Sequence, residues 1–486
     1  MKHITFLLHR FLPQWRDQER SLPLIDHPLD TGTKRPRVEL PSLVQHPTIA
    51  DHLLTLLAPV RWEAFPHRRC DRVWPGPAPH DPVPYLVAFL LKIDQEISSM
   101  GKLVDFLVQH PEIVWLAGFP LHPDETSVWG FDPTRSVPSP TLFSQVLRRF
   151  DNRRLQFLLD ETVRQLRATL PSDAKLGMTI SFDTKHILAW VKENNQRTYI
   201  EEGRYDKKRQ PKGDPDCRLG CKRRRNKSPE QLLFETPTKE GTAAEGIGAG
   251  IGEFYWGYAS GIVATKIPKW GEFVLAEWTQ PFDQSDVAYF FPLMAQTERR
   301  LGKKPQNGTA DAAFDAFYIY EYFHNAGGIA AIPFVQRGRE ARRIFLADGT
   351  PCCDAGLPMS LANTFINRSS LIEHERQRWA CPLCHPQANG QNCPIQHKNW
   401  AKGGCLTTIA SSIGARLRYE IDRESELYRH IYAQRTASER IFSQAKASGI
   451  ERPKLRNYQS IANYNTLIYT LLNLRALERI RHNQLA

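Results

Sequence analysis

Four polar residues near the C-terminal end are spaced as they would be along one side of an α-helix. They form the pattern Tyr-x2-Arg-x3-Glu-x6-Lys and are Tyr432, Arg435, Glu439 and Lys446. Because an α-helix advances about 100° per residue, steps of three, four and seven return to nearly the same side. The carboxylate can hold a metal ion, the cations can neutralise phosphate, and the tyrosine can stack on a base. The simpler alternative is an exposed helix with an Arg435–Glu439 ion pair, which stabilises by only roughly 0.3 kcal/mol.

The pattern resembles the Tyr-Arg-Glu-Lys signature of DDE transposases of bacterial insertion sequences, in the group with a β-rich insertion before the catalytic glutamate. The resemblance covers roughly residues 80–480. Asp183, in the run Ser-Phe-Asp-Thr, resembles the first catalytic strand of the family. Asp311, in the run Ala-Asp-Ala-Ala-Phe-Asp-Ala, resembles the second motif. The chain lacks the Asp-Arg-Glu-x-Asp-Ile version of that motif, so Asp315 competes with Asp311 for the same role.

The resemblance implies an RNase H-like catalytic domain that cleaves and joins DNA. Asp183 would bridge two Mg²⁺ or Mn²⁺ ions, and Asp311 and Glu439 would bind one ion each. Two divalent cations about 3.5–4 Å apart assist in-line attack on a phosphodiester, and Mg²⁺ prefers oxygen ligands. The protein would act on double-stranded DNA as a homodimer on paired element ends. The residues implied to contact those ends are Tyr432, Arg435 and Lys446.

The implied reaction is hydrolysis at the element ends, followed by joining of the ends to target DNA. Two other classes of function stay open at this point. One is a transposase-derived DNA-binding protein without catalysis, and the other is an RNase H-like endonuclease that cuts but does not join. Several further acids lie around the expected strands, and we interpret them as ordinary solvated or capping residues: Glu277, Asp283, Asp286 and Asp315.

Cysteines are concentrated in one part of the chain. Six of the nine fall between Cys352 and Cys405, which is typical of a local thiol cluster and not of a disulfide framework. A Cys-x2-Cys knuckle, as in Cys381–Cys384, commonly supplies half of a tetrahedral Zn²⁺ site. The second half is irregular, and the pair Cys352-Cys353 could contribute a ligand. A Zn²⁺ site and a cluster of free thiols are therefore both open, with these candidate ligands: Cys381, Cys384, Cys393 and Cys405.

The candidate acids require a scaffold of strands and helices, and we expect a mixed α/β domain over residues 173–335 and 409–486. The run Leu176–Asp183 predicts a strand whose polar face carries Asp183. Strand-like runs come first, and alternating helix and strand follow, which favours a mixed sheet. Residues 336–408 interrupt this domain as a cysteine-containing, β-rich insertion.

A helical domain is expected before the mixed domain, over residues 81–172, after a partly mobile N-terminal segment at residues 1–80. Ser139, followed by proline, predicts the start of one of its helices, since serine caps free N–H groups and proline suits the first helical turn. That helix carries Arg148 and Arg149. The helical domain is interpreted as binding the DNA ends, although a solvated basic face explains the arginines equally well.

The charge of the chain favours a polyanionic partner. Its 486 residues carry a formal net charge of +12, and 41% are hydrophobic, which is enough for a packed protein. No apolar run approaches the roughly 20 residues that span a bilayer. The resemblance implies a cytoplasmic, nucleoid-associated bacterial protein. Residues 194–235 contain too few apolar residues to pack and are interpreted as a mobile basic arm. Its expected DNA-binding residues include Arg223, Arg224 and Arg225.

Overall fold

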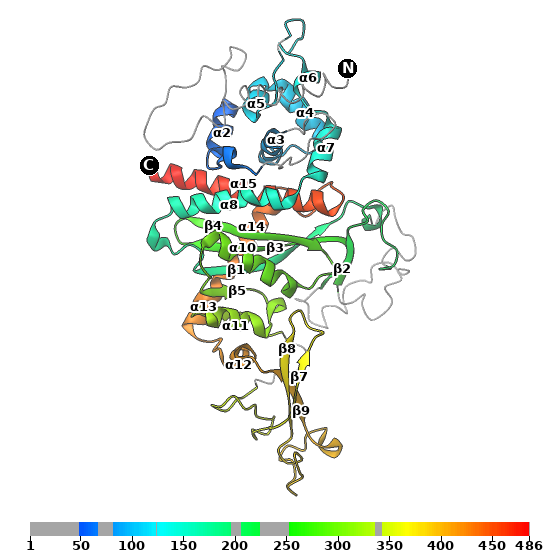
Figure 1. Ribbon diagram of the computed structural model, residues 1–486, viewed down its shortest axis with the longest axis vertical. Helices are drawn as coiled ribbons and strands as arrows, with labels where there is room; N and C mark the ends of the chain where they lie inside the picture. The colour runs from blue at the N-terminus through cyan, green and yellow to red at the C-terminus, as the bar shows by residue number, and fades with distance from the viewer. Residues whose placement is uncertain are drawn as a thin grey trace, which may run out of the picture.

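The chain forms an elongated molecule with a layer of helices at one end, a sheet in the middle and a smaller sheet at the other end (Figure 1). Most of the expected N-terminal segment lies outside the described residues, as do Arg224 and Arg225. In the part of the chain that is described, no helix is long and apolar enough to cross a membrane. The computed structural model describes residues 48–66, 81–122, 124–195, 206–223, 252–335 and 343–485.

The central sheet is mixed, which confirms the predicted α/β class. Its strands lie in the order β2-β3-β1-β5-β6, and β4 pairs with β3. The pairs β1–β3, β2–β3 and β3–β4 are antiparallel, whereas β1–β5 and β5–β6 are parallel. The strands are β1 (Thr179–Leu188), β2 (Arg218–Arg223), β3 (Gly252–Ile267), β4 (Gly271–Pro281), β5 (Asn307–Thr309) and β6 (Ala330–Ala331).

Both faces of this sheet are buried, because successive side chains of a strand point to opposite sides. In β3, Ile262 belongs to one hydrophobic cluster and Val263 to another. The first cluster includes Ile441 from a C-terminal helix, and the second includes Phe290 from a helix on the opposite face. The flanking helices are α10 (Phe290–Leu301), α11 (Phe317–Asn325), α13 (Glu426–Tyr432), α14 (Thr436–Ala447) and α15 (Tyr458–Leu485).

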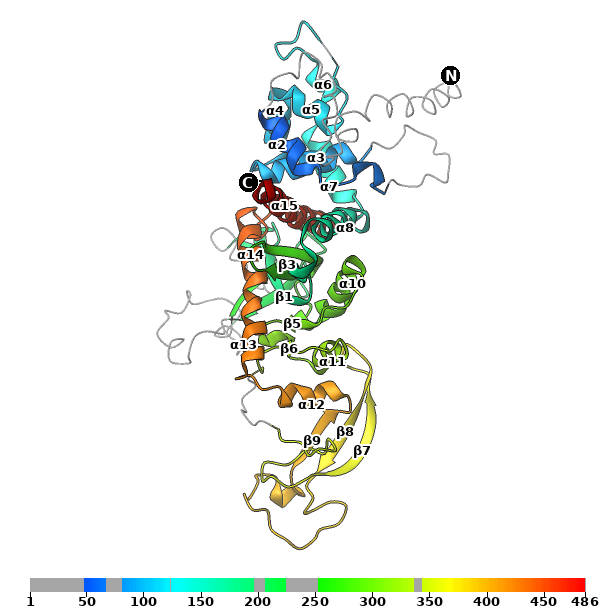
Figure 2. The same ribbon diagram turned by 90° about the vertical axis from the view of Figure 1, so that its left-hand side faces the viewer.

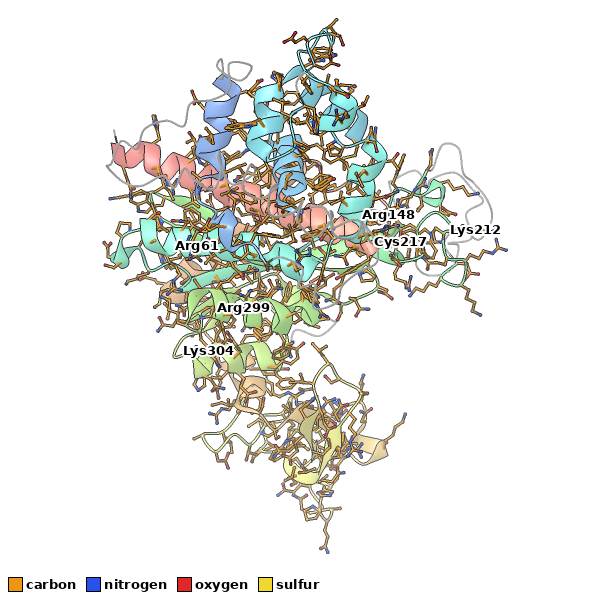
Figure 3. The ribbon with its side chains drawn as sticks, turned by 45° about the horizontal axis from the view of Figure 1, so that its top comes forward. Arg61, Arg148, Lys212, Cys217, Arg299 and Lys304 are labelled. Atoms are coloured by element: carbon orange, nitrogen blue, oxygen red, sulfur yellow. The ribbon has the colours of Figure 1, made fainter. Side chains whose placement is uncertain are left out.

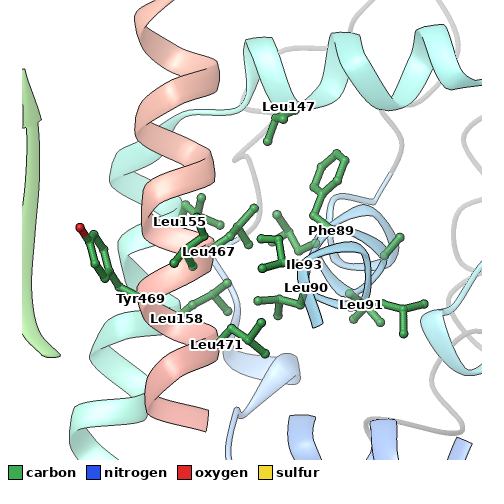
Figure 4. Packing of buried hydrophobic residues seen from close by; sticks show 14 of the residues in the cluster. Phe89, Leu90, Leu91, Ile93, Leu147, Leu155, Leu158, Leu467, Tyr469 and Leu471 are labelled. Carbon is green, nitrogen blue, oxygen red and sulfur yellow. The ribbon is translucent and has the colours of Figure 1, made fainter. Parts of the chain in front are cut away.

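Helix α15 and, beside it, the last of the N-terminal helices lie between the sheet and the other N-terminal helices (Figures 1 and 2). The apolar residues of α15 therefore face both ways, as in any helix that is buried all round. Leu467 and Leu471 point toward α3, whereas Tyr469 points the other way, where its hydroxyl lies 3.2 Å from the Ser260 hydroxyl of β3 (Figure 4). The N-terminal helices are α2 (Thr48–Leu57), α3 (Val83–Asp94), α4 (Met100–Gln109), α5 (Pro111–Ala117), α6 (Pro133–Ser136), α7 (Pro140–Arg149) and α8 (Asn152–Thr169).

The predicted helix start at Ser139 is confirmed. The Ser139 hydroxyl accepts a hydrogen bond from the backbone N–H of Leu142 at 3.2 Å, and Pro140 is the first residue of α7. Short 3-10 helices connect several of the longer elements. They are η2 (Trp62–Ala64), η3 (Ser172–Ala174), η4 (Lys192–Asn194), η5 (Asp286–Tyr289), η6 (Ala312–Phe314), η7 (Trp400–Lys402) and η8 (Ala433–Arg435).

The interpretation of residues 194–235 as a loop-like arm is wrong for residues 218–223, whereas residues 206–217 form turns and loop. Residues 218–223 form β2, which pairs with the edge of β3. Cys217 just before the strand is fully buried, and Asp214 accepts a hydrogen bond from the Tyr258 hydroxyl at 2.7 Å. Lys212 nevertheless reaches outward at the edge of the molecule, beyond Cys217 (Figure 3). The unpaired edge of β3 supplied backbone partners that the composition of the segment does not reveal.

The insertion forms a separate three-stranded antiparallel sheet in the order β7-β8-β9, as the β-rich prediction required. It lies between α11 and α12 in the chain and projects away from the central sheet (Figure 2). None of its described residues is among the buried members of the four hydrophobic clusters. The elements are β7 (Ser360–Asn367), β8 (His374–Ala380), β9 (Leu406–Ala410) and α12 (Ile413–Glu420).

Candidate active site

Two neighbouring parallel strands bring Asp183 and Asp311 together. Ser181 of β1 is in register with Thr309 of β5, and each aspartate follows two residues later. The chain turns at Asp311, whose carboxylate accepts the backbone N–H of Ala313 at 2.8 Å and caps η6. The sheet register therefore places both carboxyl groups on the same side of the same edge.

Burial raises the pKa of Asp183 to about 7, and the nearby charges of Asp311 and Asp286 act in the same direction. The backbone N–H of Thr184, 2.7 Å from the Asp183 carboxylate, partly offsets this effect. Asp286 is held in place by the Thr184 hydroxyl, which donates to it at 2.6 Å. A divalent cation would relieve this repulsion between partly buried carboxyl groups.

Asp286 is a neighbour of Asp183 that the sequence did not identify as a site residue; its position predicts only a solvated or capping acid. It lies in η5, about one hundred positions after Asp183, and only the folded sheet brings the two residues near each other. The interpretation of Glu277 as a solvated or capping residue is wrong. Glu277 is 1% exposed and accepts a hydrogen bond from Gln156 at 2.6 Å. Asp283 is exposed, as expected.

Helix α14 is attached to β1 beside Asp183. The Ser181 hydroxyl lies 2.7 Å from the Ser438 hydroxyl, and it also donates to the backbone oxygen of Arg435 at 3.2 Å. Both serines are buried. Glu439 immediately follows Ser438, so this attachment holds the first turn of α14 against the strand that carries Asp183.

The spacing predicted that the four signature residues lie on one continuous α-helix, and this prediction is wrong. Tyr432 ends α13, Arg435 ends the 3-10 helix η8, and Glu439 and Lys446 lie in α14. A 3-10 helix is more tightly wound than an α-helix, so it changes the angle between the residues on either side. Tyr432 stacks on Tyr428, with ring centroids 5.8 Å apart.

Glu439 and Arg435 form an ion pair with 2.6 Å between Oε1 and Nη2, and the Glu439 side chain is 47% exposed. Burial works to lower the pKa of Arg435, but the charges of Glu439, Tyr432 and Asp183 raise it overall. The Arg435 guanidinium thus lies within the field of both acids. As the side chains stand, no three His, Cys, Asp or Glu residues in the described ranges form a finished metal site. Asp183 and Asp311 fit a divalent cation, and Glu439 would have to leave Arg435 to join them.

Asp315, the competitor of Asp311, is fully engaged in a buried network. Its side chain is 0% exposed and pairs with Arg418, whose Nε lies 2.6 Å from Asp315 Oδ1. The Tyr320 hydroxyl and the backbone N–H of Val335 also donate to Asp315, each at 2.9 Å. A carboxylate with these donors has a structural role, so the geometry favours Asp311 as the acid that faces Asp183.

Lys446 pairs with Glu451, with 3.4 Å between Nζ and Oε2, while its side chain stays 64% exposed. Glu451 also pairs with Lys185, 2.5 Å from its Nζ. Lys185 is a residue that the sequence did not single out. Because side chains alternate along a strand, Lys185 lies on the same face of β1 as Asp183. That two-residue step was the signal that could have identified it.

The other predicted DNA contacts lie away from the acids. Arg148 and Arg149 are exposed at the end of α7, in the helical layer beyond α15 (Figures 1 and 3). Arg223 ends β2, and its side chain is outside the described residues. Asp183 and Asp311 therefore lie in the central sheet, whereas the basic residues of α7 lie in the helical layer.

The predicted thiol cluster does assemble in the insertion. Cys381, Cys393 and Cys405 line one small cavity together with Cys353, and the backbone N–H of Cys384 donates to the Cys381 carbonyl at 3.2 Å. No disulfide is formed among the described cysteines.

Comparison with protein-family models finds no match for this chain, and comparison with curated proteins finds no similar sequence.

Proposed function

We propose that the chain is a metal-dependent DNA transposase of the DDE type, with an RNase H-like catalytic domain. The observation that carries this proposal is the pairing of Asp183 and Asp311 on neighbouring parallel strands, with the Glu439 helix attached to β1 at Ser181. The order of the parts also agrees with the family. The first acid lies on the first strand, the second follows a parallel strand, and the glutamate lies on a later helix after a β-rich insertion.

The proposed metal ligands are Asp183 as the bridge and Asp311 and Glu439 as single ligands. Two Mg²⁺ or Mn²⁺ ions bound there would activate the attacking oxygen and stabilise the leaving oxygen. Arg435 has a separate task. When Glu439 turns toward the aspartates, the Arg435 guanidinium loses its partner and becomes available to a DNA phosphate, which it can bind in a bidentate manner.

Lys446 and Lys185 extend this phosphate-binding surface. Both contact Glu451, and Lys446 remains largely exposed, so a phosphate could approach the pair from solvent. The net charge of +12 supports double-stranded DNA as the partner. A homodimer on paired ends and a location in the bacterial cytoplasm at the nucleoid belong to the same proposal.

One observation favours the non-catalytic alternative, a DNA-binding protein. Glu439 is bound to Arg435, which is the arrangement expected of an ordinary exposed ion pair. The two functions are distinguished by cleavage, since a DNA-binding protein retains affinity for the element ends but does not break them. An endonuclease without strand transfer would cleave the ends and yield no joined product.

The test uses a plasmid that carries the DNA flanking the gene on both sides, where the proposal expects the element ends, with Mg²⁺ or Mn²⁺ present. Asp183→Asn, Asp311→Asn and Glu439→Gln should each lower the cleavage rate by roughly 1000-fold, because each removes a ligand of the ions. Binding of the same DNA should be largely retained.

Glu426→Gln is the matched control, since Glu426 is an exposed glutamate at the start of the preceding helix. It should cleave at the unaltered rate. Full cleavage by Glu439→Gln would overturn the catalytic assignment, and cleavage without joined products would favour the endonuclease.

A further inference from the structure

Within its described residues, the insertion has strands but only a few buried apolar side chains, such as Met359 and Leu383, in place of the apolar core that usually stabilises a sheet. Along β7 and β9 every residue is exposed or half-buried, and in β8 only Ala380 is buried. Leu406 is 64% exposed and Ile366 is 48% exposed. A unit of this size with so little buried apolar surface normally depends on another source of stability, such as disulfides or a metal ion.

The cysteines occupy the position where a core would be. Cys381 is buried at the end of β8, where it lines one small cavity with Cys393 and Cys405, and its thiol lies within electrostatic range of the thiols of Cys384 and Cys405. Cys384 in turn lies within electrostatic range of Cys393. Four thiols from three separate turns therefore converge at the end of the insertion that is farther from the central sheet.

The backbone around these thiols is shaped for close approach. Gly404, with φ of +89°, packs so tightly that a Cβ there would lie 3.0 Å from Cys381 Sγ and 3.3 Å from Cys384 Sγ. The turn after Cys381 is closed by the backbone N–H of Cys384, which donates to the Cys381 carbonyl at 3.2 Å. This is the compact turn that a Cys-x2-Cys half-site requires.

A backbone donor distinguishes Cys393 from Cys353, the other thiol at the edge of the cluster. The N–H of His397 points at Cys393 Sγ from 3.4 Å. Hydrogen bonds from outside the ligand shell orient metal ligands and stabilise their charge. The Cys353 thiol lines the same cavity but receives no such bond among the described contacts.

We propose that Cys381, Cys384, Cys393 and Cys405 bind one structural Zn²⁺ ion, which takes the place of a hydrophobic core in the insertion. Four sulfur ligands in a tetrahedron, each about 2.3 Å from the ion, form a closed structural site. The free thiols do not yet have that geometry, so binding would draw them together, with release of their protons to solvent. This inference is independent of the proposed DNA chemistry.

The test measures zinc by elemental analysis in the full chain, reduced, loaded with Zn²⁺ and freed of excess metal without a chelator. We expect about one zinc ion per chain. Cys381→Ser and Cys384→Ser should each reduce the zinc content to near zero, and Cys393→Ser should do the same. Cobalt loaded in place of zinc should show thiolate-to-metal absorption, which reports the sulfur ligands directly.

Cys353→Ser is the matched control, because it changes a thiol of the same cavity that is not among the four proposed ligands. It should keep about one zinc per chain. Absence of zinc from the reduced wild-type chain would overturn the site. Loss of zinc in Cys353→Ser, with retention in Cys393→Ser, would overturn the ligand set. Neither result depends on DNA cleavage, so a failure here is distinguishable from a failure of the proposed function.

Discussion

The central domain and the insertion are both built around sheets, yet they are stabilised in different ways. The central sheet buries both faces, with fully buried residues such as Phe182 and Phe290 in contact across its core. The insertion leaves nearly all of its strand residues exposed or half-buried and gathers thiols where apolar side chains would normally lie. The difference indicates that only the central domain buries enough apolar area to offset the repulsion between neighbouring carboxyl groups such as those of Asp183 and Asp311.

The two regions meet at α12, and the junction combines close backbone packing, arginine contacts and apolar contacts. Gly414 packs so closely on α11 that a Cβ there would lie 2.1 Å from the carbonyl oxygen of Phe317. Arg418 pairs with Asp315, and the guanidinium of Arg423 lies 3.5 Å from the centre of the Phe334 ring. Arginine pairs therefore set the position of the insertion together with apolar contacts, since Ile372, Leu417 and Ile421 pack against the central cluster.

The largest predicted effect compares the same substitution in the two regions. Phe290→Ala should lower the free energy of unfolding by about 3–5 kcal/mol, because it leaves a cavity in a fully packed cluster. Phe365→Ala in β7 should cost about 1 kcal/mol or less, since Phe365 is only half-buried and contacts no hydrophobic cluster. Denaturant titration of both variants, followed by fluorescence and circular dichroism, measures the difference. Equal losses would show that the insertion has a core after all.

The second prediction concerns the junction. Asp315→Asn should lower the free energy of unfolding by about 3 kcal/mol, because it leaves the Arg418 charge without its buried partner. Asp311→Asn is the matched control and should change stability little, since asparagine caps a helix about as well as aspartate. If Asp311→Asn proves the more destabilising of the two, the structural and catalytic assignments of these acids must be exchanged.

These two aspartates also show how far the sequence could lead. Local patterns predicted the capped start of α7 and the strand that carries Asp183, since both depend on neighbours in the chain. The sequence could not separate Asp311 from Asp315, because the deciding contact comes from Arg418, about one hundred residues later and beyond the insertion. Roles set by long-range contacts are not encoded in spacing.

The same limit explains the other differences. Glu277 is buried because α8 and α15 supply hydrogen-bond donors to it, and neither helix is near it in the chain. The pairing of β2 with β3 depends on an available strand edge. The local spacing of the signature residues is compatible with a continuous α-helix. The 3-10 helix η8 interrupts that helix at Arg435, where the Ser181 hydroxyl of β1 donates a hydrogen bond to the backbone oxygen.

The smallest predicted effect is a gain in stability. Asp183→Asn should raise the free energy of unfolding by about 2 kcal/mol at pH 8 without divalent cations, roughly half of the ~4 kcal/mol that the full pKa difference corresponds to, because Asp183 is only half-buried and solvent screens part of the penalty. The pKa of Asp183 is about 7 in the folded chain, against an ordinary value of 3.8. Between these values the folded state binds more protons than the unfolded state, so the penalty of the ionised carboxyl grows as pH rises and is complete above pH 7.

Denaturant titrations of the metal-free protein at several pH values check this sign. The gain from Asp183→Asn should be present at pH 8 and disappear as the pH falls toward 4, where the carboxyl is largely protonated in both states. Asp283→Asn, at an exposed acid nearby, should show no such trend. Added Mg²⁺ should shrink the gain, because a bound cation compensates the charge of the native aspartate. A gain that stays constant with pH would mean that the pKa of Asp183 is not raised in the folded central domain.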